Sequence, residues 1–113
     1  MKYWVLLLLF WSLPLNAEFF LPGTEDIPLM DGIVQVEENA AFDDPEERMV
    51  FISGQTNLSA TDVLRFYEKT LANLGWKKKK PYYFERGMDS LLIEIVPKGS
   101  KNLIQFQLKQ LNN

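Results

Sequence analysis

One stretch of this sequence, residues 60–74, has a clear helical period, and it limits the folds that the rest of the chain can adopt. Its apolar side chains recur every three or four positions, at Val63, Tyr67, Leu71 and Leu74. Ser59 is a natural N-cap with Asp62 three positions later, and Gly75 can supply the left-handed residue that ends a helix. Because a single amphipathic helix of about four turns is not stable alone, the sequence predicts that this helix packs on a β-sheet.

Two strand patterns precede the helix. Residues 33–37 alternate between apolar and polar side chains, and residues 48–55 do so again, with Val50 and Ile52 on one side. Between them, residues 43–46 have the sequence Asp-Asp-Pro-Glu, which is typical of a turn. We therefore expect an antiparallel hairpin with a rather long acidic loop.

Further strand patterns follow the helix. Residues 76–80 and 82–86 form either two strands or one edge strand bent at Pro81. Residues 90–96 and 102–110 have a period of two, and the second of these has one polar face. The expected order is ββαβββ. The sequence thus predicts an α+β domain, with a single antiparallel sheet of about four to five strands and one helix packed on one face.

The N-terminal end of the chain has the pattern of an export signal. Lys2 is followed by an apolar run from Tyr3 to Trp11 and then by a small residue, Ala17, which is the order found in secretory signal peptides. We place a signal peptide at residues 1–17 with cleavage near Ala17, and this predicts a periplasmic or secreted protein. The alternatives are an uncleaved membrane anchor, for which the apolar run is short, or a buried segment of the domain.

Residues 18–31 form the next expected segment. They contain Pro22-Gly23 and Ile27-Pro28, so a regular helix is not expected, while the apolar residues between argue against disorder. We interpret residues 18–31 as an extended arm that lies over the domain and uses its aromatic side chains as plugs. The α+β domain itself is expected to span residues 32–113.

The side chains most used in catalysis are absent, since the sequence contains no histidine and no cysteine. This excludes Ser–His and Cys–His nucleophile pairs and the ordinary zinc and haem ligand sets. A carboxylate-only enzyme stays open, with Glu94 as its candidate because it is the one acid inside an apolar strand pattern. Residues 43–47 could bind calcium, but they lack the spacing of a calcium loop and also fit a solvated turn. No catalytic residue, cofactor or metal site is therefore predicted.

Charge is distributed unevenly along the chain. Residues 18–62 hold eleven acidic residues and one basic residue, whereas residues 63–113 hold four acidic and ten basic residues. Such a domain can dock on a charged partner, or its two halves can neutralise each other in the fold.

The candidate binding residues lie just after the helix: Lys77, Lys78, Lys79, Lys80, Tyr82 and Tyr83. Clustered lysines beside aromatic rings suit an anionic surface. The alternative interpretation is that the lysines protect an edge strand against aggregation.

The helix and the residues after it also resemble a known element. The stretch from Val63 to Trp76 contains Phe66-Tyr67 within the helix and ends in Leu-Gly-Trp. In these features it is similar to small exported bacterial envelope domains, in which such a helix leads into a meander of strands. The resemblance implies that fold and a bacterial envelope setting, and it carries no catalytic residues.

Three hypotheses about function follow. The first is a non-enzymatic exported interaction module that binds an envelope protein through the exposed sheet face or the rim from Lys77 to Phe84. The second is peripheral binding to anionic lipid or cell-wall polymer through the same rim. The third is a small carboxylate-only enzyme. Nucleic acid is not an expected partner, because the chain is predicted to be exported.

Overall fold

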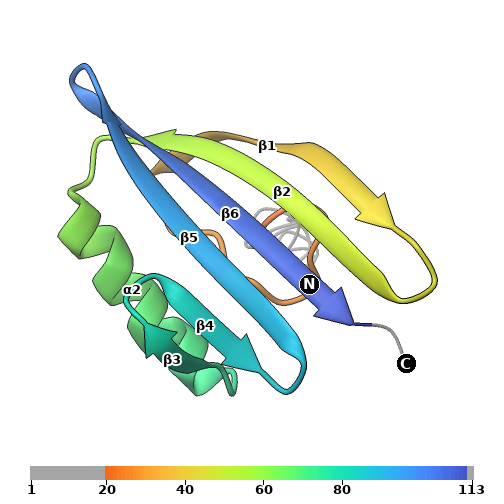
Figure 1. Cartoon of the computed structure of the whole chain (residues 1–113). Coiled ribbons are helices and arrows are strands. Elements are labelled where there is room, and N and C mark those ends of the chain that lie inside the picture. Colours follow the sequence, from red (N-terminus) through yellow and green to blue (C-terminus); the bar gives the residue numbers. More distant parts are fainter. Residues whose placement is uncertain (1–19, 112–113) are drawn as a thin grey trace, which may run out of the picture.

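A computed structural model describes residues 20–111 of the protein as an α+β fold (Figure 1). The elements of this region follow in the order β1 Ile33–Asp43, β2 Glu47–Thr56, α2 Ala60–Asn73, β3 Lys77–Lys80, β4 Tyr83–Arg86, β5 Asp89–Lys98 and β6 Lys101–Leu111. The six strands form one antiparallel sheet in the order β1-β2-β6-β5-β4-β3. Strands β1 and β3 are therefore the two edges of this sheet.

The expected strand number of about four to five and the expected order ββαβββ are wrong, because the sheet has six strands in the order ββαββββ. Residues 77–86 form two short strands, since the chain reverses at Pro81 and Tyr82. Tyr82 has a φ of 70° in this turn, a conformation that is uncommon for an aromatic residue. Its carbonyl oxygen accepts a hydrogen bond of 2.9 Å from the amide of Ile93, which holds the turn against β5.

Strand β1 is longer than the expected strand at residues 33–37, and the acidic loop is correspondingly shorter. Two register shifts interrupt its pairing with β2 between residues 34 and 40, and Gln35 lies there with a φ of 54°. Each shift changes the phase of the side-chain alternation, so the period-two pattern does not continue along the strand. The loop is reduced to a tight turn in which Asp44 accepts hydrogen bonds from the amides of Glu46 (2.9 Å) and Glu47 (2.8 Å).

Helix α2 begins and ends as its flanking residues predict. The Ser59 hydroxyl accepts a hydrogen bond of 3.1 Å from the amide of Asp62. At the other end, Gly75 has a φ of 94°, and the amide of Trp76 donates a hydrogen bond of 2.9 Å to the carbonyl oxygen of Leu71. No helix within residues 20–111 combines the length and the apolar content that crossing a bilayer requires.

The core lies between α2 and one face of the sheet. The helix contributes Val63, Tyr67 and Leu71, all fully buried. The sheet contributes alternate side chains of its inner strands: Val50, Ile52, Phe84, Leu91, Ile93, Ile104, Phe106 and Leu108. The alternation predicted for residues 102–110 is confirmed, and it leaves the intervening side chains of β6 on the opposite face.

The arm, described from Phe20 onward, lies on the same side of the sheet as α2 and passes behind β2 and β6 in Figure 1. Its plugs are aliphatic, since Leu21 and Ile27 are each 1% exposed within the core cluster. The prediction of aromatic plugs is wrong for Phe20, which is 42% exposed. The arm thus completes the apolar layer that α2 begins.

Polar contacts fasten the arm to the domain. The Tyr67 hydroxyl bonds to the backbone at Pro28 and Met30. Both terminal guanidinium nitrogens of Arg86 donate to the carboxylate of Asp26, at 2.8 and 3.3 Å. The predicted signal peptide at residues 1–17 lies outside the described residues, as do the first two residues of the arm.

Candidate functional site on the open face of the sheet

The sheet face opposite α2 is not covered by any other element among residues 20–111 (Figure 1). Directly paired residues on adjacent strands point to the same face of a sheet. The pairing places four open-face residues in one row across β2, β6, β5 and β4: Phe51, Gln107, Leu92 and Tyr83. The next row contains Ser53, Gln105 and Glu94. This open face therefore presents apolar, amide and hydroxyl groups side by side.

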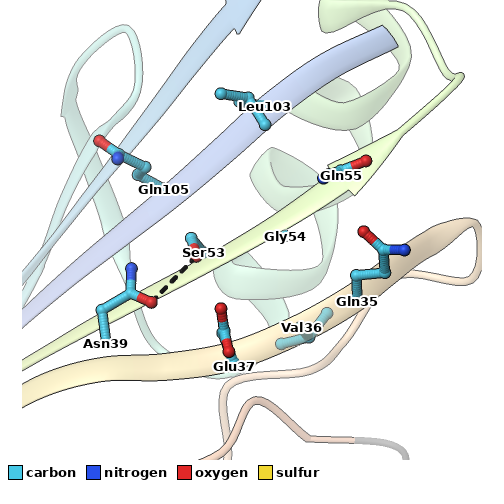
Figure 2. Close-up of a pocket in the computed structure, with 9 residues that line it drawn as sticks. All are labelled: Gln35, Val36, Glu37, Asn39, Ser53, Gly54, Gln55, Leu103 and Gln105. Carbon is cyan, nitrogen blue, oxygen red and sulfur yellow. Dashed lines mark hydrogen bonds between the residues drawn. The ribbon is translucent and has the colours of Figure 1, made fainter.

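Two adjoining hollows form a groove on the open face, and Figure 2 shows the larger one. The larger hollow is about 490 Å³ in volume, and most of the side chains that line it are polar and uncharged, including Gln35, Asn39, Ser53, Gln55 and Gln105. The smaller hollow, of about 280 Å³, shares Asn39 and Gln105 with it and also contains Phe51. The groove therefore has a polar end beside β1 and a more apolar end at Phe51.

The irregular pairing of β1 shapes the polar end of the groove. Gln35 lies within the first register shift and Asn39 within the second, and both border the same hollow (Figure 2). The Ser53 hydroxyl donates a hydrogen bond of 3.2 Å to Oδ1 of Asn39, which fixes one wall. A Cβ atom at Gly54 would lie only 2.8 Å from Cγ2 of Ile33, so a glycine at this position lets β1 pack closely against β2.

The lining determines which chemistry the groove can recognise. An amide side chain offers both donors and an acceptor, so a set of amides matches uncharged polar groups such as a polypeptide backbone. Glu94 is exposed at the border of the smaller hollow, opposite Gln105. It therefore lacks the burial that the hypothesis of a carboxylate general acid requires.

The six residues predicted as a binding site do not all lie together in the structure. Lys77, Lys78, Lys79 and Lys80 form β3, and all four are exposed at the sheet edge. The Lys78 ammonium turns toward the helix and lies 2.9 Å from Oε2 of Glu68. This edge position is the setting that the edge-protection interpretation requires.

The two tyrosines of the predicted site have different environments. Tyr82 packs against the border of the core, whereas Tyr83 is half-buried on the open face and its hydroxyl donates a hydrogen bond of 3.1 Å to Oε2 of Glu85. Tyr83 shares a shallow hollow with Lys79 and Lys80. Lys79, Lys80 and Tyr83 of the predicted rim thus lie together, whereas Tyr82 packs against the core and Lys78 pairs with Glu68 on the helix.

In the acidic turn after β1, backbone amides donate hydrogen bonds to the carboxylate of Asp44. The amides of Glu47 and Glu46 lower the pKa of Asp44 below its usual value. Within residues 20–111, no three acidic side chains lie close enough together to hold a metal ion.

From the sequence we predicted the exposed sheet face as a possible binding surface, but we did not predict the groove. Ser53, Gln55 and Gln105 could have been found, because they occupy the polar phase of their strands. Gln35 also lies in the polar phase of the pattern at residues 33–37, whereas Asn39 lies beyond that pattern and gave no such signal.

Comparison with known proteins finds no family, no curated protein and no solved structure that matches this chain.

Proposed function

We propose that this chain is an exported, non-enzymatic interaction module that binds a protein partner of the bacterial envelope through the groove on its open face. The observation that carries the proposal is the groove itself, in which the amides of Gln35, Asn39 and Gln105 adjoin the apolar surface of Phe51. A polypeptide offers the matching pair of groups, backbone amides and apolar side chains, within one short segment.

The position of the groove supports this role. The strands that carry it, β1, β2, β5 and β6, are held on their other face by the core under α2 and the arm. A surface that is already fixed loses less conformational entropy when a partner binds, which favours affinity. The envelope setting is proposed from residues 1–17 and from the resemblance around Phe66-Tyr67 and Leu74-Gly75-Trp76.

The proposal is tested by placing a photo-crosslinking amino acid at Gln105 in living cells. A matched control carries the same amino acid at Asn57, which is also exposed but lies in the loop between β2 and α2. We expect a discrete protein adduct from position 105 and none from position 57. The crosslinked partner is then purified, and Gln105→Arg is expected to weaken its binding at least about tenfold, or about 1.4 kcal/mol. The same amino acid is also placed at the open-face positions Ser53 and Gln107, and absence of any adduct from positions 53, 105 and 107 would contradict the proposal.

A second candidate function is favoured by one observation. Lys79, Lys80 and Tyr83 share a shallow hollow on the lysine edge, where a cation can meet an anionic headgroup and the ring can lie at a membrane interface. Sedimentation with vesicles of anionic lipid tests this candidate at low and high salt. Binding that is lost in K79E/K80E but kept in the distant control K98E/K101E supports it, and binding that ignores both salt and substitution rules it out.

A further inference from the structure

The two edges of the sheet carry opposite charge. Within residues 20–111, β1 pairs only with β2 and β3 pairs only with β4, so each strand has one row of backbone groups without a strand partner. Edge β1 and the turn after it carry exposed carboxylates: Glu37, Glu38, Asp43, Asp44 and Glu46. Edge β3 consists of four exposed lysines. The uneven charge seen along the sequence therefore becomes a polarity across the sheet.

The lysine edge formed by β3 can attract a strand with carboxylates and repels a strand with lysines. Lysines at an edge repel a second lysine edge, which is how such residues prevent indiscriminate pairing. They attract a strand that carries carboxylates. Because Lys78 is held by Glu68 on the helix, the lysines most available to an incoming strand are Lys77, Lys79 and Lys80.

The acidic edge offers a segment that matches β3 in length. Between residues 34 and 40 the register shifts of β1 disturb its backbone, but from Ala40 to Asp43 its pairing with β2 is unbroken. This regular segment has four residues, as β3 does, and it ends at the acidic turn. It also presents Phe42, which is 62% exposed and which contacts Phe51 edge-to-face, with ring centroids 6.0 Å apart.

From these features we infer that the occupant of each edge is a second copy of this chain, with the acidic β1 edge of one copy pairing with the lysine β3 edge of the next. The interface joins two different surfaces, so it is heterologous and generates a row or a ring of copies that continues the sheet. Two four-residue strands bury less surface than a standard stable interface, so the association is weak and depends on protein concentration. The contact adjoins the open-face groove, because Glu37 and Ala40 of this edge also line its two hollows, whereas Gln105 lies on the inner strand β6.

Charge reversal at each edge tests the inference, using the protein in the form in which cells accumulate it. The lysine-edge variant K77E/K79E/K80E leaves Lys78 with Glu68 and makes both edges acidic. The acidic-edge variant E38K/D43K/E46K places three lysines beside the remaining Glu37 and Asp44, so both edges then carry a net positive charge. The control K98E/K101E changes two lysines at the turn between β5 and β6. Circular dichroism verifies the fold, and the corresponding glutamine variants replace any reversal variant that does not fold.

Sedimentation equilibrium then measures the molar mass as a function of protein concentration. We expect the natural protein and the control to associate at low salt and to dissociate at about 1 M salt, where the Debye length falls to about 3 Å. Each reversal variant alone is expected to be monomeric, and an equimolar mixture of the two should associate again. A natural protein that is monomeric throughout, association that survives either reversal, or a mixture of folded variants that stays monomeric would overturn the inference. None of these outcomes bears on crosslinking from Gln105, so the proposed function is tested separately.

Discussion

The Tyr67 hydroxyl lies 2.8 Å from the carbonyl oxygen of Pro28 and donates a hydrogen bond to it. The hydroxyl oxygen of Tyr67 also accepts a hydrogen bond of 3.1 Å from the amide of Met30. Tyr67 is fully buried, and its ring contacts Phe106 edge-to-face, with ring centroids 5.3 Å apart. One side chain of α2 therefore joins the sheet core to the arm, and this makes the arm part of the folded unit.

Tyr67→Phe is predicted to destabilise the protein by about 1–3 kcal/mol, because it removes both hydrogen bonds and leaves the amide of Met30 and the carbonyl of Pro28 without this partner. Urea denaturation followed by circular dichroism measures the change. Tyr83→Phe is the matched control, since its hydroxyl bonds to Glu85 on a half-exposed surface. Equal losses in the two variants would show that the link between helix and arm is not important for stability.

The same side chain predicts a dependence on alkaline pH. Burial raises the pKa of Tyr67 above its usual value near 10. Above pH of about 10 the unfolded chain loses this proton while the folded chain keeps it, so the free energy of unfolding must fall as the pH rises. We expect the stability difference between the natural protein and Tyr67→Phe to be constant below pH of about 9 and to shrink above pH of about 10. A difference that does not vary with pH would contradict this assignment.

Ser59→Ala is predicted to lower stability by about 1 kcal/mol, because the amide of Asp62 loses its capping acceptor at the start of α2. Ser59→Asp keeps an acceptor at this position and should retain most of the stability. Thermal or urea unfolding of both variants measures this. If the alanine and aspartate variants are equally destabilised, capping is not the reason for the serine.

Much of the architecture could be predicted from the sequence, because most elements have one unbroken period. Strand β6 alternates cleanly between the buried Ile104, Phe106 and Leu108 and the open-face Gln105 and Gln107. The helix is defined by its apolar stripe and by both caps. In both elements, the residues that favour the local secondary structure are also the ones that the fold buries. Because the two requirements agree, the element can be recognised from the sequence.

The rest could not be predicted, because backbone irregularities leave no period. The turn that separates β3 from β4 places Tyr82 at a positive φ, a conformation usually marked by glycine or asparagine. The register shifts around Gln35 hid the length of β1 and, with it, the polar end of the groove. The role of Lys78 was equally invisible, since its partner Glu68 lies on another element and only the fold brings the two together.

The central claim is that one face of the sheet is packed and the other is open for a partner, and single-cysteine labelling tests it most directly. The chain contains no cysteine, so each variant has one thiol. Cysteine at Gln105 or Gln107 is predicted to react rapidly with a maleimide in the native state, and the partner identified by crosslinking should slow the reaction. Cysteine at Ile104 or Leu108 should react at least about 100-fold more slowly, because its exposure needs an opening of the fold. Similar rates at all four positions, or no protection of position 105 by the partner, would contradict the account.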